Sequence, residues 1–249
     1  MLRAFFKGNR RLSHRVGERT PNAAGHTYRH YAPAVWSKLD GAVPWVLDVG
    51  GGAQCIWAKQ RPRAWRGAIV AADIAPEELA RNEDTAWRVV LDGCGAFPFD
   101  GNTVPLITTQ SVLEHLPEVE AFVRESARVL VPGGYSVHWV PSRYAPFARI
   151  NALLPNAIAR RLLFFTDPGK RGICGFPVVY DHCTPAEMQA LFERHGFDVE
   201  EVRPSWYQSP YFAFFFPAFL VSLAYEYLLL RLNARPLCAH FLIVARKRS

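Results

Sequence analysis

The sequence predicts an α/β protein built on a doubly wound, mostly parallel β-sheet. Short apolar runs, several of them ending in an acid or a glycine cluster, recur from Trp45 onward, and segments with helical features separate them. Strands that alternate with helices of roughly 10–15 residues are typical of βαβ units. The chain has 249 residues, of which 50% are hydrophobic and 20% are charged. This composition excludes a disordered or collagen-like chain, and the length suffices for one substantial domain.

Three strands are expected at the start of this region. The segment WVLDVGGGAQ, from Trp45, is an apolar run that ends in an acid and three glycines, as a buried parallel strand leading into a tight turn does. The segment GAIVAADIAPEEL predicts a strand over 69–72, with Asp73 at its end and a helix that begins at Pro76. The segment WRVVLDG predicts the third strand, which ends at Asp92.

Four further strands follow. The fourth lies in VPLITTQSVLEHL, and Pro105 is expected as its first residue because proline donates no ladder hydrogen bond. A helix over about 119–130 stops at VPGG, and YSVHWVPS is the fifth strand. After a helix over about 185–195, FDVEEVRP is the sixth strand and CAHFLIVARK, over 238–247, is the seventh.

The positive charge lies at the two ends of the sequence. The net charge is +7, yet residues 1–19 hold six Lys or Arg and one Glu, and the last four residues hold three more, which leaves about −1 for residues 20–245. A folded body that binds nucleic-acid phosphates more often carries basic residues throughout, so we expect no nucleic-acid partner. The N-terminus lacks the continuous apolar stretch of a secretory signal. We interpret it as a basic arm that is solvated or touches lipid, with a transit peptide as the alternative.

Residues 210–230, PYFAFFFPAFLVSLAYEYLLL, are almost wholly apolar. Glu226 is the single charge in this segment, and Pro217 would kink a helix formed by it. A membrane-spanning helix needs roughly 20 apolar residues, whereas the uncharged run from Tyr211 to Tyr225 has fifteen. Aromatic residues at one end and arginines beyond the other favour a segment in the membrane interface. A buried helical hairpin, a dimer interface and a true span remain as alternatives.

The turn after the first strand carries the candidate cofactor site. Glycines at 50 and 52 let a ligand approach the backbone closely. Asp73, 25 residues after Asp48, occupies the position of an acid that binds ribose hydroxyls. Dinucleotide-binding enzymes share these two features, but this chain lacks the G-x-G-x-x-G pattern. An acid directly before the glycines suits an amino-acid-like cationic group better than a pyrophosphate.

Five motifs together carry a family resemblance: LDVGGGA, ADI, LDGCGAFPF, QSVLEHLP and ARVLVPGG. In this order and spacing they resemble the class I S-adenosylmethionine-dependent methyltransferases, and among these the type 11 methyltransferase domain of the small-molecule branch. The resemblance covers about residues 43–140 and a C-terminal part. It implies a Rossmann-like sheet of seven strands with an antiparallel last strand, and S-adenosyl-L-methionine as the cofactor.

The resemblance also implies which residues would bind the cofactor. Asp48 and the glycines would line its methionine end, Asp73 would hold the ribose, and the remaining residues would lie near the adenine or the sulfonium. The set is Asp48, Gly50, Gly51, Gly52, Asp73, Ile74, Asp92, Gly93 and Gln110. In the structural alternative, Asp48 hydrogen-bonds the turn and Asp73 caps the next helix. The chain departs from the family pattern at Gln54, where a third glycine is usual, and at Pro105 in the entry to strand four.

Methyl transfer requires an oriented acceptor and, for a hydroxyl or a carbon acid, a group that removes a proton. The catalytic candidates are His115, in SVLEHLP, and Tyr180 and His182, in VVYDHCTP. In the alternative, His115 has a structural role: it hydrogen-bonds the backbone or water at the start of a helix. The segment T-P-A-E at 184–187 is a capping box, so Asp181 and Thr184 are also candidates for capping a helix.

No metal or disulfide site is expected. The five cysteines are scattered and form no CxxC pair, and His182 with Cys174 and Cys183 matches no usual zinc spacing. His138 alternates within the fifth strand and is expected to be a packed strand residue. This cysteine usage favours a reducing compartment. We therefore expect a cytoplasmic protein with peripheral contact at the inner face of the membrane.

These features together predict the organisation of the chain. A basic arm and a cap helix occupy 1–42, and the methyltransferase domain occupies 43–249, with a substrate-cap insertion at 141–184 and an apolar insertion at 205–237. We expect methylation of a hydroxyl on a small-molecule, lipid-linked or glycan acceptor near the membrane. C-methylation of a prenylquinone precursor is the alternative. A tRNA or protein methyltransferase, or a non-catalytic membrane protein that binds S-adenosylmethionine, is a weaker one.

Overall fold

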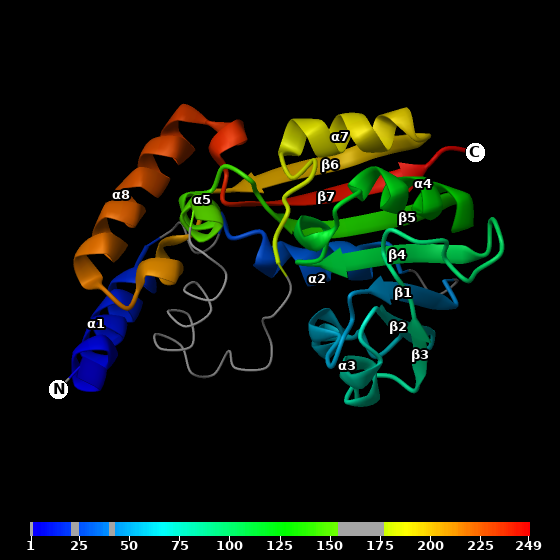
Figure 1. Cartoon of the computed structure of the whole chain (residues 1–249), viewed down its shortest axis with the longest axis horizontal. Coiled ribbons are helices and arrows are strands. Elements are labelled where there is room, and N and C mark those ends of the chain that lie inside the picture. Colours follow the sequence, from blue (N-terminus) through cyan, green and yellow to red (C-terminus); the bar gives the residue numbers. More distant parts are fainter. Residues whose placement is uncertain (1, 21–24, 40–42, 154–176) are drawn as a thin grey trace. The chain divides into compact units, whose positions relative to one another are not determined.

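The computed structural model describes residues 2–20, 25–39, 43–153 and 177–249 (Figure 1). Seven strands form one sheet in the order β3-β2-β1-β4-β5-β7-β6, and the seventh strand is antiparallel. The predicted doubly wound sheet is therefore confirmed. The chain divides into two compact units. The sheet unit consists of 27–140, 179–203 and 241–249, and the helical unit consists of 1–26, 141–178 and 204–240.

The central strands are apolar because helices cover both faces of the sheet. β1 (Trp45–Val49) pairs in parallel with β2 (Ala68–Asp73) on one side and with β4 (Val104–Gln110) on the other. As predicted, β2 ends at Asp73, and α3 (Pro76–Ala80) begins at a proline. Proline is favoured at this position because the first helical N–H has no partner within the helix.

β3 (Trp87–Val90) is the edge strand beside β2, and it ends two residues before the predicted Asp92. The reason is a local turn. The Asp92 carboxylate accepts a hydrogen bond from Cys94 N at 2.9 Å, and its carbonyl accepts one from Gly95 N at 3.0 Å. An aspartate that bonds the backbone two residues later bends the chain away from the sheet.

β5 (Leu130–Pro141) pairs in parallel with β4, and Pro105 is the second residue of β4, not the predicted first. The register between the two strands shifts between Val104 and Leu106. Because Pro105 has no N–H to donate, this irregularity places it where the ladder requires no hydrogen bond from it.

One face of the sheet is covered by α4 (Val119–Val129) and α7 (Pro185–Arg194), which contact each other. His138 of β5 lies between the rings of Phe122 and Phe192, at centroid distances of 5.4 Å to each. Burial lowers the pKa of His138 to about 3. Its ring nitrogens pair with the hydroxyls of neighbouring strand residues, Thr109 and Ser136. His138 is therefore a neutral core residue.

The opposite face is covered by α2 (Tyr28–Ser37), whose Tyr31 and Val35 are buried. They belong to a core cluster with alternating strand residues, Val46, Ile69, Leu106, Val137 and Leu242. Because side chains alternate across a strand, this set and His138 lie on different faces. Apolar packing on both faces is what a doubly wound sheet requires.

The last strands carry the C-terminal basic residues. β6 (Phe197–Ser205) is an edge strand, and β7 (His240–Lys247) lies between β5 and β6. The Lys247 ammonium donates to Leu130 O at 2.7 Å, and Arg248 pairs with Asp198 at 2.7 Å. These two basic residues therefore hold neighbouring strands and the segments beside them together.

In the helical unit, the N-terminal helix packs against the apolar segment. α1 (Leu2–Gly17), η5 (Ser209–Phe212) and α8 (Phe216–Leu232) contact one another. The Ser13 hydroxyl donates to Ala213 O at 3.1 Å, and the Asn9 side-chain oxygen accepts from Phe216 N at 2.8 Å. Two further elements are described in this unit, α5 (Pro146–Leu153) and η6 (Arg235–Leu237).

Pro217 and Glu226 fit α8 in ways that the sequence does not reveal. Pro217 is the second residue of α8, so it begins the helix and does not kink it. Glu226 is fully buried, and its Oε1 accepts hydrogen bonds from Gln208 N at 2.8 Å and from Ser209 N. The carboxylate thus satisfies two backbone donors at the start of η5. Within the described ranges, no helix is both long and apolar enough to cross a membrane.

Candidate active site

The glycine turn between β1 and η2 (Ile56–Gln60) is the centre of the predicted site. The N–H groups of Gly50 and Gly51 both donate to Ala72 O, at 2.7 and 3.1 Å, which fixes the turn to the end of β2. Gly50 has φ +76°, and a Cβ there would lie 2.1 Å from a methyl of Val112. No other residue fits at position 50, on grounds of both backbone angle and space.

Asp48 lies beneath this turn and is almost fully buried. Burial raises the pKa of its carboxyl to about 7, against the lowering effect of a hydrogen bond from the Trp57 indole at 2.9 Å. The carboxyl group therefore supports the turn from inside the protein. The role implied by the resemblance, at the methionine end of the cofactor, remains a prediction.

Asp73 stands at the end of β2, directly beside the turn. Its Oδ2 accepts from Gly52 N at 3.1 Å, and its Oδ1 accepts from Ala75 N at 3.0 Å. Each carboxylate oxygen retains a second lone pair with which it can accept a hydroxyl. A Cβ at Gly52 would lie 3.3 Å from Asp73 Oδ2, so glycine keeps the space in front of the carboxylate free. Ile74, the next residue, is 53% exposed, and its predicted contact with the adenine remains a prediction.

Asp92 and Gly93 lie in the segment after β3. Asp92 is exposed, whereas Gly93 is buried against Leu116, whose nearest methyl would lie 2.9 Å from a Cβ at position 93. Gly93 is thus required for packing, whether or not it also faces a ligand.

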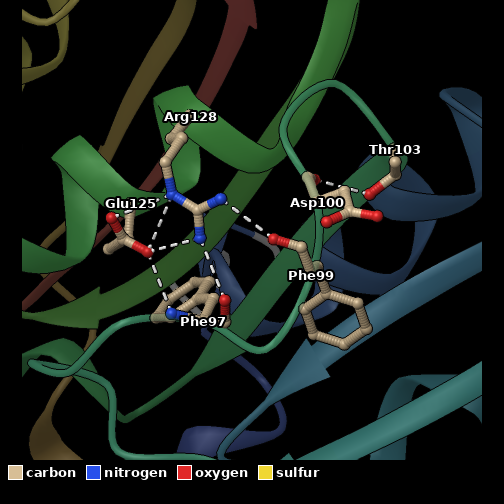
Figure 2. A network of polar contacts seen from close by, with 6 residues as sticks. All are labelled: Phe97, Phe99, Asp100, Thr103, Glu125 and Arg128. Atoms are coloured by element: carbon tan, nitrogen blue, oxygen red, sulfur yellow. Dashed lines mark hydrogen bonds and ion pairs between the residues drawn. The ribbon is translucent and has the colours of Figure 1, made fainter.

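Arg128 and Glu125 of α4 brace this segment (Figure 2). The Arg128 guanidinium donates to Phe97 O and Phe99 O, both at 2.9 Å, and to Glu125 Oε2 at 2.7 Å. Glu125 in turn accepts from Phe97 N at 2.9 Å, and the bond from Arg128 lowers the pKa of its carboxyl. At the C-terminal end of this segment, the Thr103 hydroxyl donates a hydrogen bond to Asp100 O at 2.7 Å. A rigid helix therefore positions the segment that carries Asp92.

The end of β4 brings the next predicted residues. Gln110 is its last residue and is half-buried. Ser111 then adopts φ +55°, and η3 (Leu113–His115) follows. The His115 ring is partly exposed, with Nε2 at 3.8 Å from Glu114 Oε1.

The segment 179–184 docks on this turn. The N–H groups of Val179 and Tyr180 both donate to Glu114 O, at 2.8 and 3.0 Å. Asp181 does not cap α7, in contrast to one of the sequence alternatives: its Oδ2 accepts from Val119 N at the start of α4, at 2.9 Å. The N-cap of α7 is Thr184, whose hydroxyl accepts from Glu187 N at 3.3 Å, while its own N–H donates to His182 O, so only half of the predicted capping box forms. The structure therefore brings the segments of His115, Tyr180 and His182 together.

The backbone at this junction is unusual. Tyr180 and His182 have φ +59° and +49°, a region that non-glycine residues rarely adopt and that is often found at functional sites. Asp181 Oδ1 pairs with His182 Nδ1 at 2.8 Å, which leaves Nε2 as the second nitrogen of a partly exposed imidazole. Tyr180 is buried. The arrangement supplies an imidazole oriented by a carboxylate, which is the geometry of a general base.

Two further side chains at the site were not predicted from the sequence. Asn82 is buried and donates to Gly51 O at 3.2 Å and to Gly52 O at 2.8 Å, so it braces the glycine turn. Glu114 is buried beside His115, and burial raises the pKa of its carboxyl to about 8. The E-H pair was visible in the motif QSVLEHLP, but nothing in the sequence indicated that the Glu side chain faces inward. Cys174 lies outside the described residues.

Comparisons with known proteins relate this part of the chain to a family. A family model described as a methyltransferase domain matches residues 47–138, which include the glycine turn, Asp73, Asp92, Gln110 and His115. No curated protein matches the sequence.

Solved structures share the fold at low sequence identity. An S-adenosylmethionine-dependent methyltransferase from Mesorhizobium loti is 18% identical, with a TM-score of 0.54 and coverage of 86% of this chain and 96% of that one. The geranyl diphosphate C-methyltransferase of Streptomyces coelicolor is 12% identical, with a TM-score of 0.54 and coverage of 89% and 79%. A chain in the complex of the Trm112 methyltransferase activator with a methyltransferase, from Haloferax volcanii, is 17% identical, with a TM-score of 0.55 and coverage of 91% and 92%.

Proposed function

We propose that this chain, whose residues 47–138 match a family model described as a methyltransferase domain, is an S-adenosylmethionine-dependent methyltransferase and that it methylates a hydroxyl of a small-molecule, lipid-linked or glycan acceptor near a membrane. The observation that carries the catalytic part is the contact between the glycine turn and the end of β2. Gly52 N and Asp73 Oδ2 are 3.1 Å apart, so a nucleoside and the group attached to it would meet both at once.

We assign the cofactor contacts on this geometry. Asp73 would accept the two ribose hydroxyls through the free lone pairs of its carboxylate, and Ile74 would cover one face of the adenine. Asp92 and Gly93 would lie toward the adenine amino group, on the segment that Arg128 holds. Gly50, Gly51 and Gly52 would let the methionine part approach the backbone, with Asp48 below them, and Gln110 would lie near the sulfonium. When bound, S-adenosylmethionine supplies the reactive methyl carbon.

For the acceptor side we propose that His182 removes the hydroxyl proton and that Asp181 positions its ring. Support comes from the 2.8 Å contact between the two side chains and from the partial exposure of the imidazole. His115 and Tyr180 are the other candidates, since both lie at the same junction. Methyl incorporation from labelled S-adenosylmethionine into a membrane extract would distinguish them. His182→Ala should abolish incorporation if His182 is the base, whereas full incorporation would shift the role to His115 or Tyr180.

The lipid-linked acceptor is supported by the helical unit, in which the apolar α8 packs beside the basic α1. Phenol or sugar hydroxyls are our first choice of acceptor atom. Carbon methylation of a prenylated quinone precursor is the second. A non-catalytic protein that binds the cofactor at a membrane would make the same contacts through the glycine turn and Asp73. Only a measurement of methyl transfer distinguishes it from an enzyme.

Binding of S-adenosylhomocysteine, measured by calorimetry, tests the proposal without knowledge of the acceptor. We expect the purified chain to bind it and Asp73→Ala to weaken the affinity by about 5- to 150-fold, which corresponds to ~1–3 kcal/mol for charge-assisted hydrogen bonds in a desolvated site. Asp100→Ala, a matched change at an exposed carboxylate, should leave the affinity unchanged. A folded wild-type chain that binds neither S-adenosylhomocysteine nor S-adenosylmethionine would rule out the methyltransferase proposal.

A further inference from the structure

The two faces of α8 do not show the usual distribution of polarity, because both are largely apolar and the one carboxylate of the helix is on the buried side. Its buried side is formed by Phe219, Ser222, Leu223, Glu226 and Leu229, and therefore contains a carboxylate and a hydroxyl. Its outward side is mostly apolar: Leu220, Val221, Leu228 and Leu232 are 41%, 72%, 54% and 66% exposed. At 100° per residue these four positions fall within one arc of about 120°, which near the C-terminal end of the helix also contains the exposed Arg231.

Exposure to water would not favour an outward face with this many apolar side chains. A surface helix normally turns its polar residues outward and its apolar stripe toward the core. In α8 the buried carboxylate of Glu226 accepts hydrogen bonds from the backbone of Gln208 and Ser209. The protein thus fixes the helix from within by hydrogen bonds and leaves the leucines and the valine outside. A contiguous exposed apolar face of this kind marks a surface that another apolar phase covers.

From these observations we propose that the outward face of α8 lies in the interfacial layer of an anionic lipid bilayer, with α1 bound to the headgroups beside it. This inference deepens the membrane part of the proposed function and rests on it for the acceptor, but it concerns the helical unit alone.

The charge of α1 identifies lipid as the occupant. α1 contacts α8 and contains no acidic residue. Lys7, Arg11 and Arg15 are exposed and recur every four residues, so they form one basic stripe along the helix. Phe5 and Leu12, also exposed, lie along one side of this stripe. A basic stripe beside apolar side chains is the signature of a helix that lies in the membrane interface and attracts anionic headgroups.

A second copy of this chain is the competing occupant of the α8 face. Two copies meeting through α8 would bring two basic α1 helices into one assembly, where like charges repel. An anionic surface instead neutralises them. Arg231 at the end of α8 is exposed and adds to the same positive charge.

Vesicle flotation of the full chain tests the proposal. We expect the wild type to float with vesicles of phosphatidylcholine and phosphatidylglycerol, to float poorly with phosphatidylcholine alone, and to dissociate as salt is raised. Val221→Asp should lower the bound fraction about tenfold, because a carboxylate would enter the apolar layer. The matched control is Val90→Asp, the same change at a residue 60% exposed on the edge strand β3, which should float as the wild type does.

The basic stripe is tested separately. Combining Lys7→Glu, Arg11→Glu and Arg15→Glu should remove the dependence on anionic lipid. Equal flotation of wild type and Val221→Asp would overturn the proposal. So would a wild type that fails to float and sediments as a dimer, with Val221→Asp monomeric, since a second copy would then cover α8. Calorimetry with S-adenosylhomocysteine on the same samples keeps the two proposals apart. A wild-type chain that binds S-adenosylhomocysteine but does not float refutes the membrane surface alone, and a wild-type chain that floats but does not bind it refutes methyl transfer alone.

Discussion

Glu114 is a carboxylic acid held out of water at the junction where 179–184 docks. Its carbonyl accepts the two N–H groups of that segment, while its side chain is buried and Oε2 has no hydrogen-bond partner within the described part of the chain. Desolvation favours the neutral form and raises the pKa to about 8. At neutral pH the side chain is therefore mostly a protonated acid next to His115.

This environment makes stability depend on pH. The folded pKa of Glu114 lies above the unfolded value of 4.5, so the folded state binds more protons between these two values. Its contribution is complete below about pH 4.5 and is lost as pH rises through about 8. Glu114→Gln keeps the shape of the neutral acid and cannot ionise. We expect it to be more stable than wild type by ~1–3 kcal/mol at about pH 8.5 and similar at about pH 5, by urea unfolding.

Burial also raises the pKa of Asp48 to about 7, so Asp48 too makes the free energy of unfolding fall as pH rises. Because Asp48 is present in both wild type and Glu114→Gln, its effect cancels when the two are compared. Glu83→Gln, a change at an exposed glutamate, is the control and should follow wild type at both pH values. A Glu114→Gln profile parallel to that of wild type would mean that Glu114 is ionised in the folded state.

Single residues differ in how far the sequence reveals them. The glycines and Asp73 were predictable because a tight turn and a strand end restrict which residues fit there. Pro105 was misplaced by one residue because a register shift in β4 accommodates it. Asn82 could not be predicted as a brace, since its partners lie about thirty residues away and carry no sequence signal.

At the scale of elements, the buried Glu226 explains how α8 and η5 stay together. Glu226→Ala would leave Gln208 N and Ser209 N buried without their acceptor. We expect a loss of ~2–6 kcal/mol in the free energy of unfolding, at ~1–3 kcal/mol for each of the two orphaned donors, and faster hydrogen exchange of both amides. Glu226→Gln retains an acceptor oxygen and should lose less.

The control for this prediction is Leu230→Ala, a change of an exposed side chain in the same helix. It should alter the free energy of unfolding little. If Glu226→Ala were as stable as Leu230→Ala and its amides stayed protected, the carboxylate would not be the group that holds η5.

The elements themselves were predictable to different degrees. Strand and helix order followed from apolar runs and caps, because these depend on local periodicity. The function of Glu226 did not, because a lone acid in an apolar run reads equally well as an interruption of a membrane segment. Only the fold shows that the acid faces backbone donors some seventeen residues earlier in the chain.

At the scale of the whole molecule, two units are each assembled from separate stretches of the chain. Sequence periodicity located the sheet but gave no means of knowing that α1 packs with α8, since such a pairing depends on side chains such as Asn9 and Ser13 that bond backbone about two hundred residues away. The sequence also places positive charge at both ends of the chain without distinguishing them. In the structure they differ: Lys7, Arg11 and Arg15 are exposed on α1, whereas Lys247 bonds Leu130 O in the sheet unit.

The two ends should therefore respond differently to loss of charge. Lys247→Met removes the bond to Leu130 O and the contact with Asn102 while keeping most of the side-chain volume. We expect it to lower the free energy of unfolding by ~0.5–1.5 kcal/mol and to leave vesicle flotation unchanged. Lys59→Met, at an exposed lysine, should change neither property. The triple Glu variant of α1 should show the opposite pattern, with weaker flotation and little change in the affinity for S-adenosylhomocysteine. Were Lys247→Met to reduce flotation as much as the α1 variant does, net charge alone would drive membrane binding, and the α1 stripe would have no specific part in it.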